Sequence, residues 1–240
     1  MILSSEKSSS TSKLDPLFCL TIPRSGYHLL IKRIDFYFGC TAQHVELSRY
    51  RPWGLPISKL AEHGISLNHD GGINRAWPWS RIYGFPKRAT SKYLVLFRNP
   101  LLSLISEFQL HERNGLKREG SVDEWREYAI KGIRFRKRFI RKWLIDFNGD
   151  NVLKLSYEQC TANPKDCLRT AIEHAQRVKE PLNGETLQAC LNRFPFAGHR
   201  VYEDFKYYEN VFFEELKSRL DETAAYLEEH EEYEIDLSLG

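Results

Sequence analysis

Four short apolar runs stand out along the chain, at residues 17–22, 65–67, 93–97 and 152–155. Apolar runs of this length, bounded by polar and turn-forming residues, are typical of strands that are buried on both faces of a sheet. The pattern therefore predicts four buried strands.

Helix-like stretches lie between and after these runs. The stretch after the first run ends at Gly39, a residue type that favours a helix C-terminus. Asn99 and Pro100 follow the third run, as a capping residue and a proline at the first helical position. Three further helices are predicted, over residues 122–147, 164–176 and 207–230.

Alternating strands and helices imply crossover connections, a mostly parallel sheet and ligands at the carboxyl ends of the strands. We therefore expect an α/β fold with about four to five strands flanked by helices. Residues 1–16 are polar, lack the apolar core of a secretory signal and are expected to form a disordered leader. Residues 17–240 are expected to form one domain.

Charge is distributed unevenly, although the formal net charge is only +3. The segment from Asp221 onward holds eight acidic residues and no Lys or Arg, and it is expected to be the solvated end of the last helix. Residues 1–220 therefore carry a net charge of +11. A basic body favours anionic partners such as phosphorylated small molecules, nucleic acid or anionic lipid, or is simply a solvated surface.

Apolar runs and cysteines restrict the class of protein further. No apolar run approaches the ~18 residues of a membrane span, so no membrane association is expected. The five cysteines are odd in number and none form a CxxC pair. We therefore expect neither a disulfide framework nor a zinc site, and a reducing cytoplasmic location.

The first predicted strand runs directly into a turn and a helix, in the sequence TIPRSGYHL at residues 21–29. A glycine-containing turn at a helix N-terminus presents backbone N–H groups to an anion, and Arg24 adds a cation. The segment does not match GxxxxGK[ST]. That mismatch disfavours a kinase using ATP and Mg²⁺.

A second cation follows the third strand, because Arg98 leaves that strand at its carboxyl end. Ser106 lies eight residues further, about two turns into the helix that Asn99 caps. Arg98 suits bidentate binding of a phosphate, and Ser106 suits donation of a hydroxyl hydrogen bond.

These features together resemble the cytosolic-type sulfotransferases: a strand, PRSG and a helix, then RNP with a serine eight residues after its arginine, then LSYEQ. The resemblance covers roughly residues 17–175. It implies a P-loop-like parallel sheet and the donor 3′-phosphoadenosine 5′-phosphosulfate (PAPS), with no metal required. In-line transfer would move the sulfuryl group to a hydroxyl or amine of a small molecule.

Several donor-binding residues are implied by the same resemblance. Arg24 would lie beside the 5′-phosphosulfate and take part in catalysis, and Arg98 and Ser106 would hold the 3′-phosphate. Tyr157 would lie near the adenine. The loop that cradles the phosphosulfate would be formed by Ser25, Gly26, Tyr27 and His28.

The sequence departs from the family at several positions. Threonines are common in the family where Tyr27 and His28 stand, and Leu29 replaces the aromatic residue that stacks on the base. Near the C-terminus, residues 204–206 (DFK) stand for an Asp-Trp-Lys run, but Arg-Lys-Gly is missing. His199 or Arg200 would have to close over the 3′-phosphate instead.

His69 is the expected general base. It follows the second strand and stands 29 residues before Arg98, where such enzymes often carry a histidine. A histidine accepts a proton readily near pH 7. Leu67 replaces the family's lysine two positions earlier, and His28 and Asp70 remain alternatives.

The acceptor site is expected in the long loop at residues 68–90, because loops of this length are commonly functional. Its aromatic residues would line or cover a small-molecule pocket: Trp77, Trp79, Tyr83 and Phe85.

The basic run at residues 131–142 (KGIRFRKRFIRK) raises the alternative of an RNA-binding protein that is not an enzyme. However, apolar residues recur at helical spacing through this region, so one face is expected to be buried while the cations face water. They are Ile133, Ile140, Trp143 and Phe147. Nucleic acid is therefore not the expected partner.

Overall fold

A computed structural model describes residues 17–39, 45–46, 65–68, 92–115, 120–176, 179–195 and 204–220. Several predicted features lie outside these residues, so they are not assessed by the structure. They are the leader, His69 and Asp70, the aromatic residues of the long loop, His199, Arg200 and the acidic tail.

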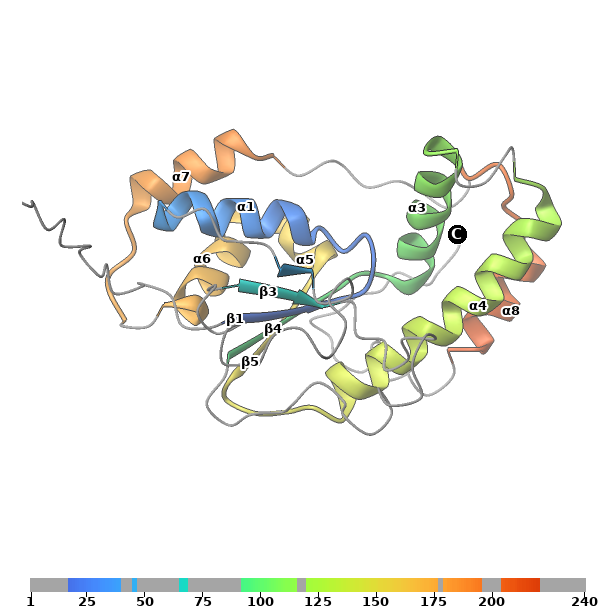
Figure 1. Ribbon diagram of the computed structural model, residues 1–240, viewed down its shortest axis with the longest axis horizontal. Coiled ribbons are helices and arrows are strands. Elements are labelled where there is room, and N and C mark those ends of the chain that lie inside the picture. The colour runs from blue at the N-terminus through green and yellow to red at the C-terminus, as the bar shows by residue number, and fades with distance from the viewer. Residues whose placement is uncertain are drawn as a thin grey trace, which may run out of the picture.

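A parallel sheet of five strands forms the centre of the molecule, in the order β2-β3-β1-β4-β5 (Figure 1). The strands are β1 (Leu17–Thr21), β2 (Val45–Glu46), β3 (Ile65–Asn68), β4 (Lys92–Phe97) and β5 (Val152–Ser156). The α/β class and the four predicted strands are confirmed, and β2 is an addition at the edge of the sheet.

The helices predicted after residue 26, after Asn99, over 122–147 and over 164–176 begin and end close to the predicted residues, and α5 and α7 are additions. Gly39 ends α1 with a left-handed φ of 63°, and Asn99 caps α3 by accepting hydrogen bonds from the N–H groups of Leu101 and Leu102. The helices are α1 (Tyr27–Phe38), α3 (Pro100–Arg113), α4 (Val122–Ile140), its π-helical continuation η2 (Arg141–Ile145), α5 (Tyr157–Ala162), α6 (Pro164–Ala175), α7 (Gly184–Arg193) and α8 (Asn210–Ser218).

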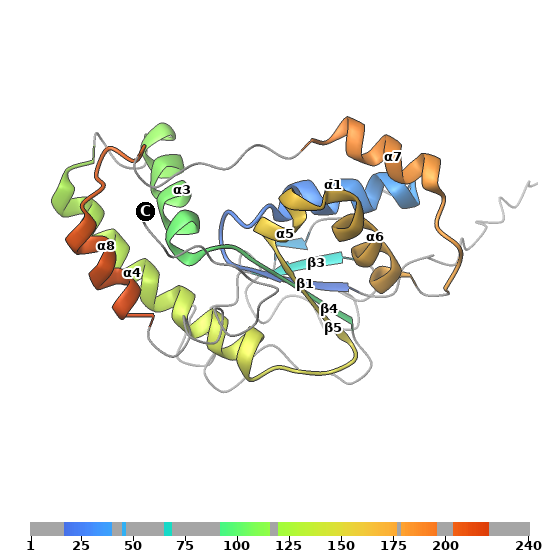
Figure 2. The ribbon, with the colours of Figure 1, turned by 180° about the vertical axis from the view of Figure 1, so that it is seen from behind.

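Each face of the sheet has its own cover of helices, as views from opposite sides show (Figures 1 and 2). Leu94 and Leu96 of β4 pack with α1, α5, α6 and α7. The alternate residues Tyr93, Val95 and Phe97 pack on the other face against the end of α4 and η2. Burial on both faces explains why the strands read as continuous apolar runs.

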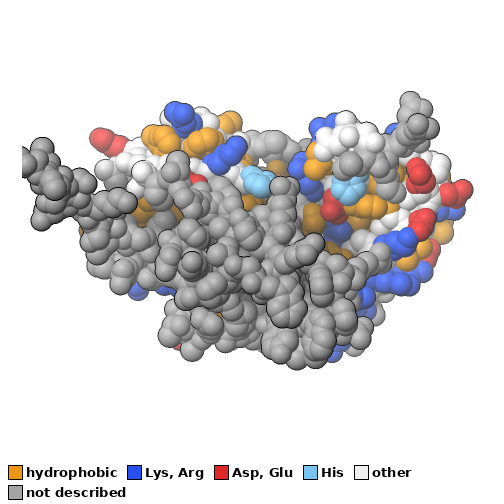
Figure 3. Space-filling view, viewed as in Figure 1, with side chains coloured by type: hydrophobic (Ala, Val, Ile, Leu, Met, Phe, Trp, Pro, Cys, Tyr) orange, Lys and Arg blue, Asp and Glu red, His pale blue; other side chains and the backbone are white. Residues whose placement is uncertain are grey.

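A third apolar cluster joins α3, the first half of α4 and α8 beside the sheet. The basic run lies within α4 and η2. Its predicted apolar face is confirmed, because Ile133, Ile140, Trp143 and Phe147 are all buried. Lys and Arg side chains gather on the surface over this helix (Figure 3).

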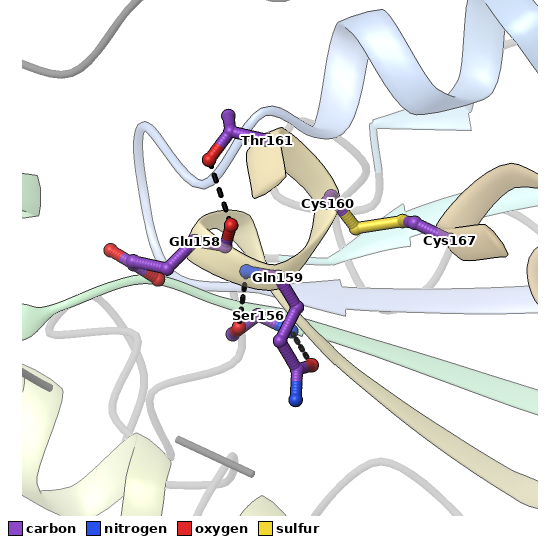
Figure 4. Close-up of a disulfide and its surroundings, with 6 residues drawn as sticks. All are labelled: Ser156, Glu158, Gln159, Cys160, Thr161 and Cys167. Atoms are coloured by element: carbon purple, nitrogen blue, oxygen red, sulfur yellow. Dashed lines mark hydrogen bonds between the residues drawn. A yellow bond between two sulfur atoms is a disulfide. The ribbon is translucent and has the colours of Figure 1, made fainter. Parts of the chain in front are cut away.

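Two expectations about the chain are wrong. The last helix begins at Asn210 rather than near Tyr207, and it ends at Ser218 rather than near residue 230, since residues 219–220 form a turn. Cys160 and Cys167 form a disulfide, with their Cα atoms 5.0 Å apart (Figure 4). Pro164 begins α6 two residues after α5 ends, so the two short helices bring cysteines seven residues apart together. Neither the odd number of cysteines nor the missing CxxC pair indicates that Cys160 and Cys167 lie close together.

Candidate nucleotide site

The two predicted anion-binding segments lie side by side at the carboxyl edge of the sheet. β1 and β4 are neighbours, and Thr21 pairs with Leu96 near their ends. The Ile22 N–H donates to the Leu96 carbonyl oxygen at 3.3 Å, so the contact continues past the end of β1. Register alone therefore brings the segments carrying Arg24 and Arg98 together.

The segment between β1 and α1, residues 22–26, forms a tight turn that we call the β1–α1 loop. Its Ser25 hydroxyl is buried and donates to the Ile22 carbonyl oxygen at 2.8 Å. Arg24 and Gly26 both adopt left-handed φ angles, 67° and 79°. That conformation is uncommon for arginine. The turn ends at the N-terminus of the twelve-residue α1, where orphan N–H groups and the helix dipole favour an anion.

Arg24 and Ser106 are in direct contact. The exposed Arg24 side chain reaches α3, where its Nε donates to Ser106 Oγ at 3.2 Å. The family resemblance places these residues at different phosphates of the donor. Here one hydrogen bond joins them, so the two side chains lie next to each other.

Arg98 joins the loop to the first residue of α5. Its guanidinium carbon lies 4.5 Å from the centre of the Tyr157 ring, and its Nη1 donates to the Arg24 carbonyl oxygen at 3.3 Å. Arg98 and Tyr157 are each 8% exposed. A cation held over an aromatic face in a partly desolvated position keeps its charge near the carboxyl edge of the sheet.

Glu158 makes a contact beside Arg98 that the sequence does not predict. Its Oε1 accepts the Asn99 N–H at 2.9 Å, which fixes the start of α3 to α5. A capping box between Ser156 and Gln159 holds the first turn of α5 (Figure 4). An acidic residue directly after Tyr157 was the available signal, but the contact depends on β4 and β5 being neighbours.

The remaining loop residues contribute differently. The ring of Tyr27, the first residue of α1, is 5% exposed and packs in the apolar core. His28 is exposed in the first turn of α1. His69 lies outside the described residues. The residue before it, Asn68, ends β3 and pairs with Leu20 of β1.

The segment at 204–207 lies at the far end of α3. Phe205 packs edge-to-face on Trp125 at 4.7 Å, and Lys206 forms an ion pair with Glu112 at 3.0 Å. Burial alone would raise the pKa of Glu112, but hydrogen bonds from Lys206 and Tyr207 outweigh it and lower that pKa. Glu112 lies six residues after Ser106, about 9 Å along the helix. Lys206 therefore anchors this segment to α3 away from Ser106.

The described part of the chain shows neither a metal cluster nor a membrane span. In that part of the chain, no group of three or more His, Cys, Asp or Glu is arranged to hold a metal ion. None of its helices is both long and apolar enough to cross a membrane.

Comparison of the fold with solved structures decides the architecture. The mouse sulfotransferase SULT7A1, complexed with PAP, matches with a TM-score of 0.58 and 16% identity over 88% of this chain and 85% of that one. The chain has the sulfotransferase fold. A sulfotransferase from Alicyclobacillus acidocaldarius also matches, with a TM-score of 0.53 and 12% identity over 90% of this chain and 94% of the other.

The sulfotransferase fold confirms the architecture that the resemblance implied. No protein-family model matches the sequence, and no curated protein matches it. At identities of 12–16% the likeness is one of fold. Function must therefore be argued from the site.

Proposed function

We propose that the protein is a sulfotransferase that uses PAPS as donor and a small-molecule hydroxyl or amine as acceptor. One observation carries the proposal within this fold. The cations that follow two adjacent strands, Arg24 and Arg98, are linked through the Arg24 carbonyl oxygen, and Ser106 of α3 contacts the Arg24 side chain. A compact pair of cations beside a helix N-terminus suits a ligand with two separated anionic groups.

PAPS carries two such groups, a 5′-phosphosulfate and a 3′-phosphate. In the proposal, Arg24 and the backbone N–H groups of Ser25 and Gly26 receive the 5′ group. Arg98 and Ser106 hold the 3′-phosphate, and Tyr157 lies near the adenine. The Arg24–Ser106 hydrogen bond would have to open or be shared when both phosphates bind, because each side chain then has an anionic partner.

The proposed reaction is an in-line displacement at sulfur. The acceptor oxygen or nitrogen forms a bond to sulfur while the bond from sulfur to the 5′-phosphate oxygen breaks. The acceptor proton passes to His69, and 3′-phosphoadenosine 5′-phosphate (PAP) leaves. Arg24 and the loop N–H groups stabilise the negative charge that grows on the departing phosphate, since fixed donors help most where charge develops. No metal is required in this scheme.

The assignment of His69 rests on its position in the chain. It directly follows β3, whose last residue pairs with Leu20 of β1. The carboxyl end of β3 therefore lies on the same edge of the sheet as Arg24. His28 and Asp70 remain the alternatives.

The proposal also covers the acceptor pocket and the cellular location. The aromatic loop at residues 68–90 is proposed to line the acceptor pocket. Cytoplasm is the proposed location, where Cys160 and Cys167 would be kept in the reduced thiol form.

An RNA-binding protein is the second candidate, because the structure exposes a row of cations on α4 and η2. Arg134, Arg138 and Arg141 are all exposed and recur at spacings of four and three residues, which places them on one face. This reading predicts RNA affinity with a steep salt dependence and no effect of PAP on it.

An acceptor screen with PAPS labelled in the sulfuryl group tests the proposal. We expect label on at least one hydroxyl- or amine-containing compound without added metal. Arg24→Ala should abolish most of that transfer, whereas Arg138→Ala, which removes an exposed cation from α4, should not. Phosphoryl transfer from ATP with Mg²⁺ in place of sulfuryl transfer, or no label on any phenol, alcohol or amine, would contradict it.

A further inference from the structure

Arg136 is the one cation of the basic run that is buried. Of the seven Lys and Arg residues between 131 and 142, the other six are partly or fully exposed, whereas Arg136 is 1% exposed. A buried guanidinium is costly unless its charge and its N–H groups are satisfied. Its partners therefore indicate why it is buried.

Two of those partners, Ser103 and Glu107, lie on α3, and Ser103 also contacts the β1–α1 loop. Nη2 of Arg136 pairs with Glu107 at 2.9 Å, and Nε and Nη2 donate to Ser103 Oγ at 3.1 and 2.9 Å. Nη1 donates to the Gly132 carbonyl oxygen at 3.2 Å. The ion pair with Glu107 balances the buried charge of Arg136. Two nitrogens of the guanidinium, Nε and Nη2, both donate to the Ser103 hydroxyl.

These bonds fix the direction of the Ser103 hydroxyl. A serine hydroxyl has two acceptor lone pairs and one hydrogen, and arginine can only donate. With two bonds accepted from Arg136, the remaining hydrogen of Ser103 is donated to the Pro23 carbonyl oxygen at 2.7 Å. Arg136 therefore acts on the loop through Ser103.

Two successive carbonyl groups of the loop are held in this way. Ser103 holds the Pro23 oxygen, and Arg98 holds the oxygen of Arg24. In a trans peptide the C=O and the following N–H point in opposite directions. Anchoring both carbonyls therefore turns the N–H groups of Arg24 and Ser25 away from α3 and Arg98. It also supports the left-handed φ of 67° at Arg24.

We infer that Arg136 is a positioning residue for the β1–α1 loop, acting through Ser103, and that this arrangement prepares the loop for the 5′-phosphate end of the donor. The nucleotide part of the inference rests on the proposed function. The arrangement itself does not, because it consists of contacts within the chain. The basic run thus has one buried member that supports the loop and six that are partly or fully exposed.

The test compares Ser103→Ala with the double substitution Arg136→Met and Glu107→Gln, which avoids leaving Glu107 as an unpaired carboxylate. Arg134→Met, on an exposed residue of the same helix, is the matched control. Affinities for PAP and for adenosine 3′-phosphate, which lacks the 5′ group, are measured by calorimetry. Hydrogen exchange of the peptide covering residues 22–27 is measured on the same full-length chains without nucleotide.

We expect both variants to weaken PAP binding by roughly five- to tenfold, the size of one well-placed hydrogen bond. Binding of adenosine 3′-phosphate should stay close to that of the unmodified chain. Combining Ser103→Ala with the double substitution should lower PAP affinity no further than either change alone, because both changes act through the Ser103 hydroxyl. Exchange in residues 22–27 should become faster in both variants and stay unchanged in Arg134→Met.

Unchanged exchange in residues 22–27 would overturn the inference, as would equal losses for the two nucleotides. A merely destabilised fold would produce equal losses. If the unmodified chain fails to bind PAP while the variants still exchange faster, the proposed function is wrong and Arg136 still supports the loop. The two failures are therefore distinguishable.

Discussion

Replacing Arg98 with alanine should weaken PAP binding far more than binding of adenosine 5′-monophosphate (AMP), which lacks the 3′-phosphate. The substitution removes a guanidinium that is 8% exposed, lies 4.5 Å from the Tyr157 ring centre and donates to the Arg24 carbonyl oxygen. It therefore removes the proposed 3′-phosphate partner and one support of the β1–α1 loop together.

The magnitude follows from these two contributions. A hydrogen bond to a charged group contributes about 1.5–3 kcal/mol, which is roughly ten- to a hundredfold in affinity for PAP. The bond to the Arg24 oxygen acts on the loop and affects both nucleotides alike. It should add about 1 kcal/mol at most, because it is a single long bond at 3.3 Å.

Calorimetric titration with both nucleotides separates the two contributions. The ratio of PAP to AMP affinity should fall about ten- to a hundredfold in Arg98→Ala, while AMP affinity alone falls much less. Arg138→Ala removes an equal charge from an exposed position on α4 and should leave the ratio unchanged. Equal losses for PAP and AMP would refute the reasoning, because Arg98 would then serve only the loop.

Three further outcomes are expected. Replacing Cys160 and Cys167 with serine should lower the free energy of unfolding by about 2–3 kcal/mol, a modest loss because the disulfide closes a short loop of the chain. Urea unfolding measures this, and the reduced unmodified chain should have the same stability as the variant. The pKa of Glu112 is lowered in the fold. The ionised carboxylate therefore stabilises the fold at pH values above 4.5, its ordinary pKa, and this stabilisation is lost as the pH falls through the lowered pKa. Glu112→Gln should therefore be less stable near neutral pH and lose less stability on acidification, measured by thermal unfolding across pH. His69→Ala should lower turnover ~10²–10⁴-fold with PAP affinity nearly unchanged, and normal turnover would move the role to another group.

Much of the fold was predictable because it depends on local pattern. β1 and β4 are buried on both faces and read as apolar runs, and Asn99 followed by Pro100 marks the start of α3 by its own chemistry. β2 has only two residues, which is too short for any period to show. The six residues of α5 are likewise too few for a helical pattern, and only the capping box at Ser156 marks them.

The site was predictable as far as its residues follow strand ends. Arg24, Arg98 and Ser106 are found together because adjacent parallel strands end at one edge. The contacts of Glu158 and Arg136 were not predictable, because they depend on how α5 and α4 lie against α3. In the sequence, Arg136 is one cation among seven with nothing to distinguish it.

The central claim is that Arg98 and Ser106 form a 3′-phosphate site beside a phosphate-binding loop. Calorimetric titration of the full-length chain with PAP and with AMP, at one salt concentration and without metal, tests it most directly. Two charge-assisted contacts to the 3′-phosphate predict that PAP binds at least roughly a hundredfold more tightly than AMP. Equal affinity for the two nucleotides would contradict the account.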